Sequence, residues 1–233
     1  MKDIVKMVVN PVLQTLPGAT RTRVKEWAEV QYWKRVLKQS GGTFYNGHFE
    51  KRYTELFDLP REHFAGKRML DVGCGPLGSL EWADDASRRV GADPLAAQYM
   101  ELNAGQQEME YVAAGGEDLP FEDGAFDVVS CFNALDHVED VPRSVAELER
   151  VLAPGGDLLL IVEIDHEPTV TEPHRLRTSI VDDFAQCVVI TSDVFAIRDD
   201  HDVYASLREA KPRAKPTDPA ILCARLQKVS ERN

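Results

Sequence analysis

The chain has 233 residues, an ordinary globular composition and a marked excess of acidic side chains. Hydrophobic residues make up 43% and charged residues 28%, which argues against disordered and fibrous classes of protein. Asp and Glu number 39 against 27 Lys and Arg, so the formal net charge is −12. A negative surface of this size repels phosphate backbones, and we therefore expect no nucleic-acid partner.

The cysteines and the apolar runs indicate the compartment. No two of the four cysteines form a C-x-x-C pair, which argues against a zinc ribbon or a redox motif. We expect them to be small buried side chains in a reducing compartment. No run of about 18 apolar residues predicts a membrane-spanning helix. The first 18 residues lack a convincing cleavage site for a secretory signal, so the sequence predicts a cytoplasmic protein.

Positive charge is concentrated in the first 52 residues. They hold ten Lys and Arg against four acids, a balance of +6, whereas the rest of the chain has a balance of −18. Turn residues near position 60 predict a helical N-terminal cap over residues 1–60 and a core domain over residues 61–233. The basic side chains fit either a solvated helical surface or attraction to an anionic substrate, membrane or glycan, and the sequence leaves both open.

The arm is expected to fold as two helices. Helical spacing of apolar residues predicts the first over residues 21–39, ended by a pair of glycines, and the second over residues 47–58. The aromatic side chains of the first helix are predicted to lie in the helix core: Trp27, Tyr32 and Trp33.

From residue 67 onward, short apolar runs alternate with helical segments. The predicted strands are 68–73, 88–94, 109–115, 126–134, 157–164, 187–199 and 220–229. The predicted helices are 79–87, 95–104, 140–156 and 177–186, the third of them with Asp140 as its N-cap.

This alternation predicts the fold class. It favours an α/β fold: a doubly wound, mostly parallel seven-stranded sheet with helices on both faces. The last two strands are expected to be joined by a proline-rich link without a helix, and therefore to form an antiparallel pair. Ligands of such sheets bind at the carboxyl ends of the strands.

A glycine pattern follows the first predicted core strand. Gly73, Gly75 and Gly78 come between a strand and a predicted helix, where glycines allow a tight turn close to a ligand. By itself the pattern fits any nucleotide-type cofactor, or a tight turn without a ligand. Asp71 would repel a pyrophosphate but would suit an ammonium or a sulfonium. Asp93, 22 residues later, can accept both hydroxyls of a ribose, so the two acids favour an adenosine-bearing cation.

These residues and further motifs resemble the class I S-adenosylmethionine-dependent methyltransferases, in the broad group that methylates small molecules. The match is close over residues 67–163 and extends beyond them only as topology. The motifs are "LDVGCGP" at 70–76, "GADP" at 91–94, "GGEDLPFEDGAFDVVSC" at 115–131, "NALDHVED" at 133–140 and "LERVLAPGGDLLL" at 148–160.

The resemblance implies S-adenosyl-L-methionine as the cofactor and in-line methyl transfer to an oxygen or nitrogen of a small-molecule or sugar- or lipid-linked acceptor. It implies a set of cofactor residues that line the methionine part, the ribose and the adenine. They are Asp71, Gly73, Cys74, Gly75, Asp93, Pro94, Gly116, Glu117 and Asn133.

The chain departs from the family pattern at the adenine site. Gly115 stands where the family often has an Asp or Asn that contacts the adenine amino group. That contact is either lost or passes to Glu117, Asp118 or water. The glycine turn also differs, because Leu77 occupies the place of a common third glycine and Gly78 comes one residue later.

A histidine after the fourth core strand is the leading candidate for a general base. His137 lies at the ligand-bearing edge of the predicted sheet and titrates near neutral pH, although a packing role fits the same position. Neighbouring polar and aromatic residues are candidates for acceptor contacts. They are Tyr45, Asp136, His166 and His174. Their spacing matches no metal motif, so we expect no metal.

Two other functions fit parts of the pattern. A nicotinamide-dependent oxidoreductase would use the same glycine turn, but Asp71 argues against a pyrophosphate there. A non-catalytic module with a methyltransferase-like fold would keep the cofactor site without turnover. The sequence does not indicate which acceptor is methylated or which oligomeric state the chain adopts.

Overall fold

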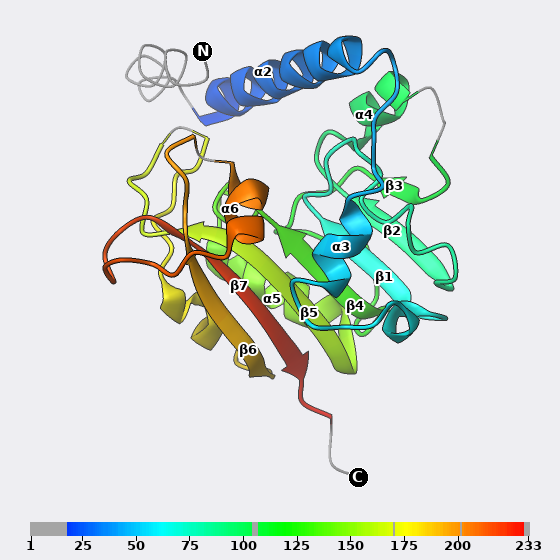
Figure 1. Ribbon diagram of the computed structural model, residues 1–233. Helices are drawn as coiled ribbons and strands as arrows, with labels where there is room; N and C mark the ends of the chain where they lie inside the picture. Colours follow the sequence, from blue (N-terminus) through cyan, green and yellow to red (C-terminus); the bar gives the residue numbers. More distant parts are fainter. Residues whose placement is uncertain (1–17, 104–106, 170, 201, 231–233) are drawn as a thin grey trace.

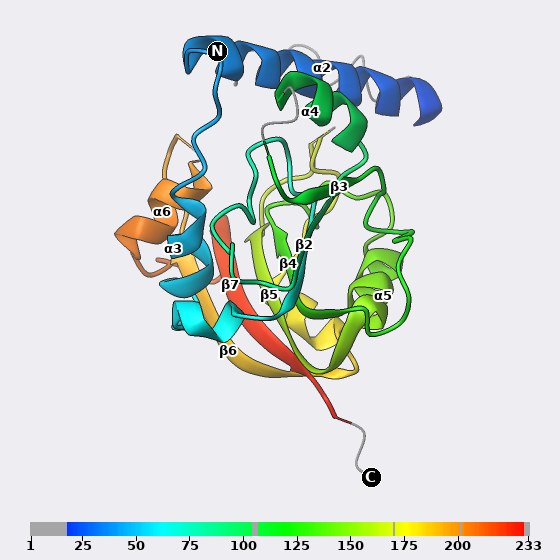
Figure 2. The same ribbon diagram turned by 90° about the vertical axis from the view of Figure 1, so that its right-hand side faces the viewer.

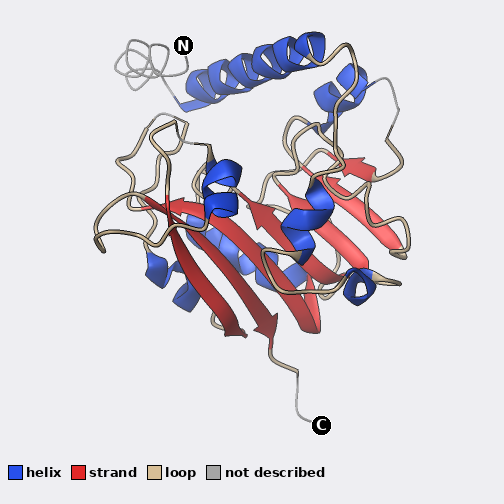
Figure 3. Cartoon of the chain, viewed as in Figure 1, coloured by secondary structure: helices blue, strands red, loops and turns tan. Residues whose placement is uncertain are grey.

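The computed structural model describes residues 18–103, 107–169, 171–200 and 202–230. The strands are β1 (Arg68–Val72), β2 (Arg88–Ala92), β3 (Glu110–Val112), β4 (Phe126–Phe132), β5 (Leu152–Ile164), β6 (Cys187–Ala196) and β7 (Ala220–Lys228). The helices are α2 (Gly18–Gln39), α3 (Phe49–Thr54), α4 (Ala96–Asn103), α5 (Val141–Val151) and α6 (Val203–Glu209), with 3-10 turns η1 (Arg61–Phe64) and η2 (Thr178–Asp183). Figure 3 shows how these elements are distributed along the chain.

The strands of the described residues form one seven-stranded sheet (Figure 1). Its order is β3-β2-β1-β4-β5-β7-β6. The first five strands in this order pair in parallel, whereas β7 pairs antiparallel with both β5 and β6. The predicted α/β fold, with a mostly parallel sheet and a C-terminal antiparallel strand pair, is confirmed.

Successive side chains of a strand point to opposite faces, and a hydrophobic cluster lies on each face of the sheet. Leu70 of β1 belongs to the cluster that includes Leu148 of α5. The neighbouring Met69 belongs to the other cluster, together with Tyr53 of α3 and Val203 of α6. Figure 2 shows α5 on one side of the sheet and α3 and α6 on the other. Helix α3 therefore packs on the sheet, although it lies within the basic arm.

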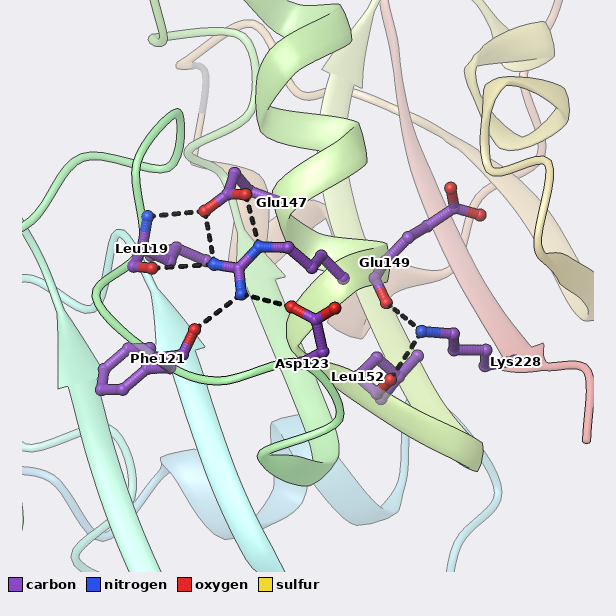
Figure 4. Close-up of polar contacts among 8 residues, drawn as sticks. Leu119, Phe121, Asp123, Glu147, Glu149, Leu152 and Lys228 are labelled. Atoms are coloured by element: carbon purple, nitrogen blue, oxygen red, sulfur yellow. Dashed lines mark hydrogen bonds and ion pairs between the residues drawn. The ribbon is translucent and has the colours of Figure 1, made fainter.

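Helix α5 has the predicted N-cap. The Asp140 side chain accepts a hydrogen bond from the Arg143 N–H at 3.0 Å, as expected for an aspartate before a helix. At the other end of the helix, the Lys228 ammonium donates to the carbonyls of Glu149 and Leu152 at 2.6 and 2.9 Å (Figure 4). Both ends are thus satisfied by side chains, which fixes the helix beside β4 and β5.

Two predictions about the connections are wrong. Residues 79–87 form turns and no helix. The Glu81 carboxylate accepts hydrogen bonds from the Glu108 and Met109 N–H groups at 2.9 and 2.7 Å, so this segment is bonded to the start of β3. The link between β6 and β7 contains a helix, α6, because Asp202 caps it by accepting from the Ala205 N–H at 2.8 Å.

Helix α2 lies across one end of the molecule, above α4 (Figures 1 and 2). Its predicted end is confirmed, since Gly41 and Gly42 follow it with φ angles of +77° and +90°. Both glycines have open space around them, because a Cβ added to either would meet no atom within 4 Å. The prediction that Trp27 lies in a helix core is wrong, because this side chain is 66% exposed. Trp33 instead points toward the turn that follows β1.

All four cysteines are free thiols. Three of them are buried as predicted, whereas Cys187 is half-buried. Among the described residues, we find no helix with both the length and the apolar character needed to cross a membrane.

Candidate active site

The glycine turn after β1 leaves no room for a side chain at Gly73. Gly73 has a φ of +76°, and a Cβ on it would lie 2.3 Å from the Cβ of Ala134. Gly75 has a φ of +58° and lies beside the indole of Trp33, which is 3.9 Å from the position of a Cβ. The turn is therefore packed against the segment after β4 at Gly73, has Trp33 of α2 nearby at Gly75, and presents backbone rather than side chains.

Asp71 is buried in a hydrogen-bond network under the turn. Its carboxylate accepts hydrogen bonds from the hydroxyls of Ser79 and Ser130, the second at 2.7 Å. The hydroxyl of Tyr53 in α3 lies 2.8 Å from that of Ser130. Burial raises the pKa of Asp71 to about 6, although the hydroxyl hydrogen bonds lower it. The carboxylate is thus held beneath the glycine turn, where the sequence predicts support for the loop and for a cationic group.

Asp93 ties the end of β2 to the glycine turn. Its Oδ2 accepts from the Gly75 N–H at 3.2 Å, and its Oδ1 accepts from the Leu95 N–H at 2.9 Å. Burial raises the pKa of this carboxyl to about 6, and the charge of Glu29 in α2 adds to the shift. Glu29 reaches this position because it accepts a hydrogen bond from the Tyr99 hydroxyl at 2.9 Å. The acid predicted to bind ribose therefore lies at the same edge as the turn, beneath α2.

The loop predicted to border the adenine lacks the Asp or Asn that the family often has at position 115, but Glu117 brings a carboxylate close to that position. Glu117 Oε2 lies 2.8 Å from the position of a Cβ on Gly115, while Oε1 accepts from the Glu139 N–H at 2.8 Å. Gly116 is buried, and the Ser144 hydroxyl of α5 lies 3.4 Å from the position of its Cβ. That hydroxyl is buried and has no hydrogen-bond partner in the described part of the chain.

Arg150 anchors the continuation of this loop to α5 (Figure 4). Its guanidinium donates to the carbonyls of Leu119 and Phe121 at 2.8 and 2.6 Å. The same group forms ion pairs with Glu147 and Asp123 at 2.7 and 2.9 Å. Hydrogen bonding to Glu147 and then to Asp123 raises the pKa of Arg150, and the loop is held by a permanent charge.

Asn133 occupies a constrained position directly after β4. Its φ is +55°, and its N–H donates to the Ile161 carbonyl at 2.6 Å. Asparagine tolerates this left-handed conformation better than most residues. Its side-chain oxygen is buried and finds no partner among the described residues. The residue predicted to face the reacting methyl thus offers an unused hydrogen-bond acceptor at the edge of the sheet.

A second cluster lies beyond Asn133, where β4 and β5 end. Asp136 is 1% exposed, and its Oδ2 lies 4.0 Å from Nε2 of His137 and 3.6 Å from Nε2 of His166. The nitrogens Nε2 of both rings and the oxygen Oδ1 of Asp136 are buried and make no hydrogen bond within the described structure, so the two rings contact the carboxylate only at these longer distances. The nearby Asp136 carboxylate raises the pKa of His166 to about 9. The structure brings these three predicted residues together.

The other predicted site residues lie apart from this cluster. Tyr45 is 73% exposed and faces His48, with the two rings 5.5 Å apart. Nε2 of His174 lies 2.8 Å from the Val138 carbonyl, so this imidazole holds a loop in place. Pro94 is exposed at the end of β2. The Cys74 thiol is buried against β2, which leaves only its backbone for a ligand.

The structure adds residues that the sequence analysis missed. Glu29 and Trp33 reach the site only because α2 folds back over it, and Ser144 only because α5 begins beside Gly116. Arg52 of α3 stacks on Tyr204 of α6, 3.2 Å from the ring centroid, and its charge lowers the pKa of Asp71. Arg52 makes no ion pair with any described residue.

Metal ligation was not expected from the sequence. In the part of the chain that the structure describes, no group of three or more His, Cys, Asp and Glu residues is arranged to hold a metal ion. The expectation of a metal-free site remains a prediction.

The chain is similar to known methyltransferases. Residues 70–160 match the family model described as a methyltransferase domain. The chain is 34% identical over 106 residues to the tocopherol O-methyltransferase of Arabidopsis thaliana, covering 41% of the chain and 30% of that protein. It is 37% identical over 105 residues to the ubiquinone biosynthesis O-methyltransferase of Pseudomonas syringae, covering 42% and 45%. The chain thus spans less than half the length of these curated relatives.

A solved structure with a bound product gives the same fold. The N-methyltransferase NodS of Bradyrhizobium japonicum, in complex with S-adenosyl-L-homocysteine, has a TM-score of 0.55 at 15% identity. The match covers 78% of this chain and 88% of NodS. At this identity the likeness shows the fold alone.

The fold, the glycine turn and the paired acids define a class I S-adenosylmethionine-dependent methyltransferase domain. The match to the methyltransferase domain lies in residues 70–160, and the glycine turn and paired acids there fit S-adenosyl-L-methionine as the cofactor.

Proposed function

We propose that the chain transfers a methyl group from S-adenosyl-L-methionine to an oxygen or nitrogen of a small-molecule or sugar- or lipid-linked acceptor. The observation that carries the proposal is the cluster of buried, unpartnered polar atoms on Asp136, His137 and His166. Buried polar atoms without partners are costly, so their gathering at the ligand edge of the sheet favours a site for a polar acceptor. The names of the relatives, which are O- and N-methyltransferases, support the same class of reaction.

The residues of the turn and its neighbours fit the cofactor. The backbone of Gly73 to Gly75 would hold the methionine part, with Asp71 below it. Asp93 would accept the ribose hydroxyls, and Pro94 would flank the adenine. Gly116 and Glu117 would border the adenine. The Glu117 carboxylate would accept a hydrogen bond from the adenine amino group, the contact that an Asp or Asn at position 115 often makes in the family. These assignments rest on burial, hydrogen bonding and the family motifs.

Arg52 and Asn133 would complete the methionine site. The guanidinium of Arg52 is stacked on Tyr204 and lacks a carboxylate partner among the described residues, so it suits the carboxylate of an amino acid. The unused Asn133 oxygen suits an ammonium or the neighbouring acceptor group. When bound, the cofactor supplies a methyl group on a sulfonium, which is already a good leaving group. The protein's part is therefore to position the acceptor and to keep water out.

His137 would remove the proton from the acceptor. Its Nε2 is buried on the side of Asp136, 4.0 Å from Oδ2, so the other ring nitrogen would take the proton. The side chain is 39% exposed, and the ring therefore lies between the buried cluster and solvent. Asp136 would stabilise the imidazolium that forms, in the manner of the acid in a catalytic triad. His166, with a pKa of about 9, would stay positively charged at neutral pH and balance the Asp136 carboxylate. The indole of Trp33 over Gly75 would limit the access of water.

A cytoplasmic location is part of this proposal. The four free thiols fit a reducing compartment, and no described helix is suited to spanning a membrane.

The test has two stages. Calorimetric titration with S-adenosylhomocysteine and with NADH should show binding of the first compound only, and binding of NADH alone would contradict the cofactor assignment. A labelled-methyl assay against pooled small-molecule and glycolipid acceptors, read by mass spectrometry, should then yield a methylated product and S-adenosylhomocysteine. Binding without turnover against every pool would favour a non-catalytic module.

A further inference from the structure

Helix α2 has two sides with different partners. The side toward the body contacts the site through three residues. Lys25 forms an ion pair with Glu139 at 3.8 Å, Glu29 accepts from Tyr99, and Trp33 lies beside Gly75. These contacts fix which face of the helix is turned away from the body.

The opposite side carries cations and one aromatic ring. Arg23, Lys34 and Lys38 are exposed, and Trp27 between them is 66% exposed. Spacings of four, seven and four residues keep these four side chains within about 60° of one another around the helix. None of the three cations forms an ion pair with a described residue, and no acid lies on this stripe. We call these four residues the outer stripe.

The outer stripe lies far enough from the acidic body to act by its own charge. The helix, with its side chains, is about 10–12 Å thick, whereas the Debye length at physiological ionic strength is about 8 Å. Fixed negative charges behind α2 are therefore largely screened at its outer surface. The stripe extends over 16 residues, or about 24 Å, which suits a flat surface better than a small ligand.

We propose that the outer stripe docks on an anionic lipid surface. Lys and Arg are attracted to the negative surface of a leaflet, and Trp prefers the boundary between headgroups and acyl chains. A nucleic acid is the alternative occupant, and the test below includes heparin and RNA as competing ligands. The docking is independent of methyl transfer, although it would bring the helix that covers the active site into contact with the membrane.

Flotation of the full chain with lipid vesicles tests the proposal. The protein should migrate with vesicles of phosphatidylcholine and phosphatidylglycerol and not with phosphatidylcholine alone. The double variant Lys34→Gln/Lys38→Gln should lower the partition coefficient about 30-fold, or about fivefold per lysine. The matched control Lys211→Gln/Lys215→Gln removes the same charge from the exposed link before β7 and should leave partitioning unchanged.

Fluorescence tests the role of the aromatic ring. Brominated lipids should quench part of the tryptophan emission of the wild type, and this quenching should disappear in Trp27→Phe. No flotation, equal losses in both double variants, or binding to heparin or RNA but not to vesicles would overturn the proposal. Titration of the same variants with S-adenosylhomocysteine gives an independent readout, because a failed docking surface leaves cofactor binding intact.

Discussion

The two halves of the site differ in how their buried polar atoms are satisfied. On the cofactor side, Asp71 and Asp93 accept four hydrogen bonds between them from hydroxyl and backbone groups. On the acceptor side, Asp136 lies within 4.0 Å of both His137 and His166, yet each of the three keeps an atom without a partner in the described chain.

This difference separates a site that is already built from one that its ligand completes. A buried polar atom without a hydrogen bond costs about 1–3 kcal/mol of folding free energy, and a polar ligand on the acceptor side can offset this cost by supplying the hydrogen bond. The two acids on the cofactor side already have hydrogen bonds and carry no such cost. Changes on the cofactor side should therefore disturb the fold, whereas changes on the acceptor side should alter turnover alone.

The largest effect is expected on the acceptor side. His137→Gln should lower the methyl-transfer rate by about 10²–10⁴-fold for a hydroxyl acceptor, because it removes the proposed base. Affinity for S-adenosylhomocysteine should stay unchanged. His63→Gln is the matched control, since His63 pairs with Asp157 at the start of the apolar part of β5, away from the ligand edge. Equal methyl-transfer rates in His137→Gln and the wild type would show that His137 is not the general base.

The next effect is expected at the glycine turn. Gly73→Ala should lower the free energy of unfolding by about 2–5 kcal/mol and abolish cofactor binding, because the new Cβ meets Ala134 and φ is positive. Gly66→Ala shares the positive φ of +69° but has open space around it, and it should cost only about 1–2 kcal/mol. Chemical denaturation of both variants measures the difference. Similar losses of stability in the two variants would show that the surroundings of Gly73 do not exclude a side chain.

A smaller loss of stability is expected in the loop beside the adenine site. Arg150→Met should lower the free energy of unfolding by about 2–3 kcal/mol, because two loop carbonyls and Glu147 lose their charged donor. Arg143→Met should cost about 0.5 kcal/mol at most, since its ion pair with Asp118 spans 3.9 Å and is exposed. Denaturation compares the two. An equal cost for both arginines would contradict the anchoring role.

The smallest effect concerns pH. The pKa values of Asp71 and Asp93 are raised to about 6, so both acids are mostly neutral near pH 5 and charged above pH 7. Affinity for the cationic cofactor should therefore rise by about tenfold between these values and then level off. Asp71→Asn should flatten part of this rise. Titration at several pH values measures it, and an affinity that falls as pH rises would contradict the argument.

The parts of the fold that depend on local pattern were predictable. The buried run of β4 and the cap of α5 at Asp140 follow from residues close in sequence. The pairing of β1 with β2 sets Asp71 opposite Gly91, so Asp93 had to lie at the same edge two residues later. For these two acids, the spacing of the motifs in the sequence was enough to predict that they lie at the same edge of the sheet.

The parts that depend on distant contacts were not predictable. Asp136 and His166 come from separate loops 30 residues apart, and nothing in their spacing indicates a distance of 3.6 Å. His174 resembled an acceptor residue, but its imidazole bonds to the Val138 carbonyl. Trp27 fitted a helical apolar pattern and is exposed, because the face of α2 that packs is decided by its contacts with α4 and the glycine turn.

The paired glycines at 41 and 42 have a consequence for turnover. If the cofactor binds at Gly75 as proposed, the neighbouring Trp33 would lie over it, and we expect release to require movement of α2. The chain between α2 and α3 has two positive-φ glycines with open space around them, at positions 41 and 42. Gly42→Ala places a side chain at a φ of +90°, where it is strained, so it should change the rate of cofactor exchange without removing any contact in the pocket. The turnover rate would then depend on a hinge that lies far from the reacting atoms.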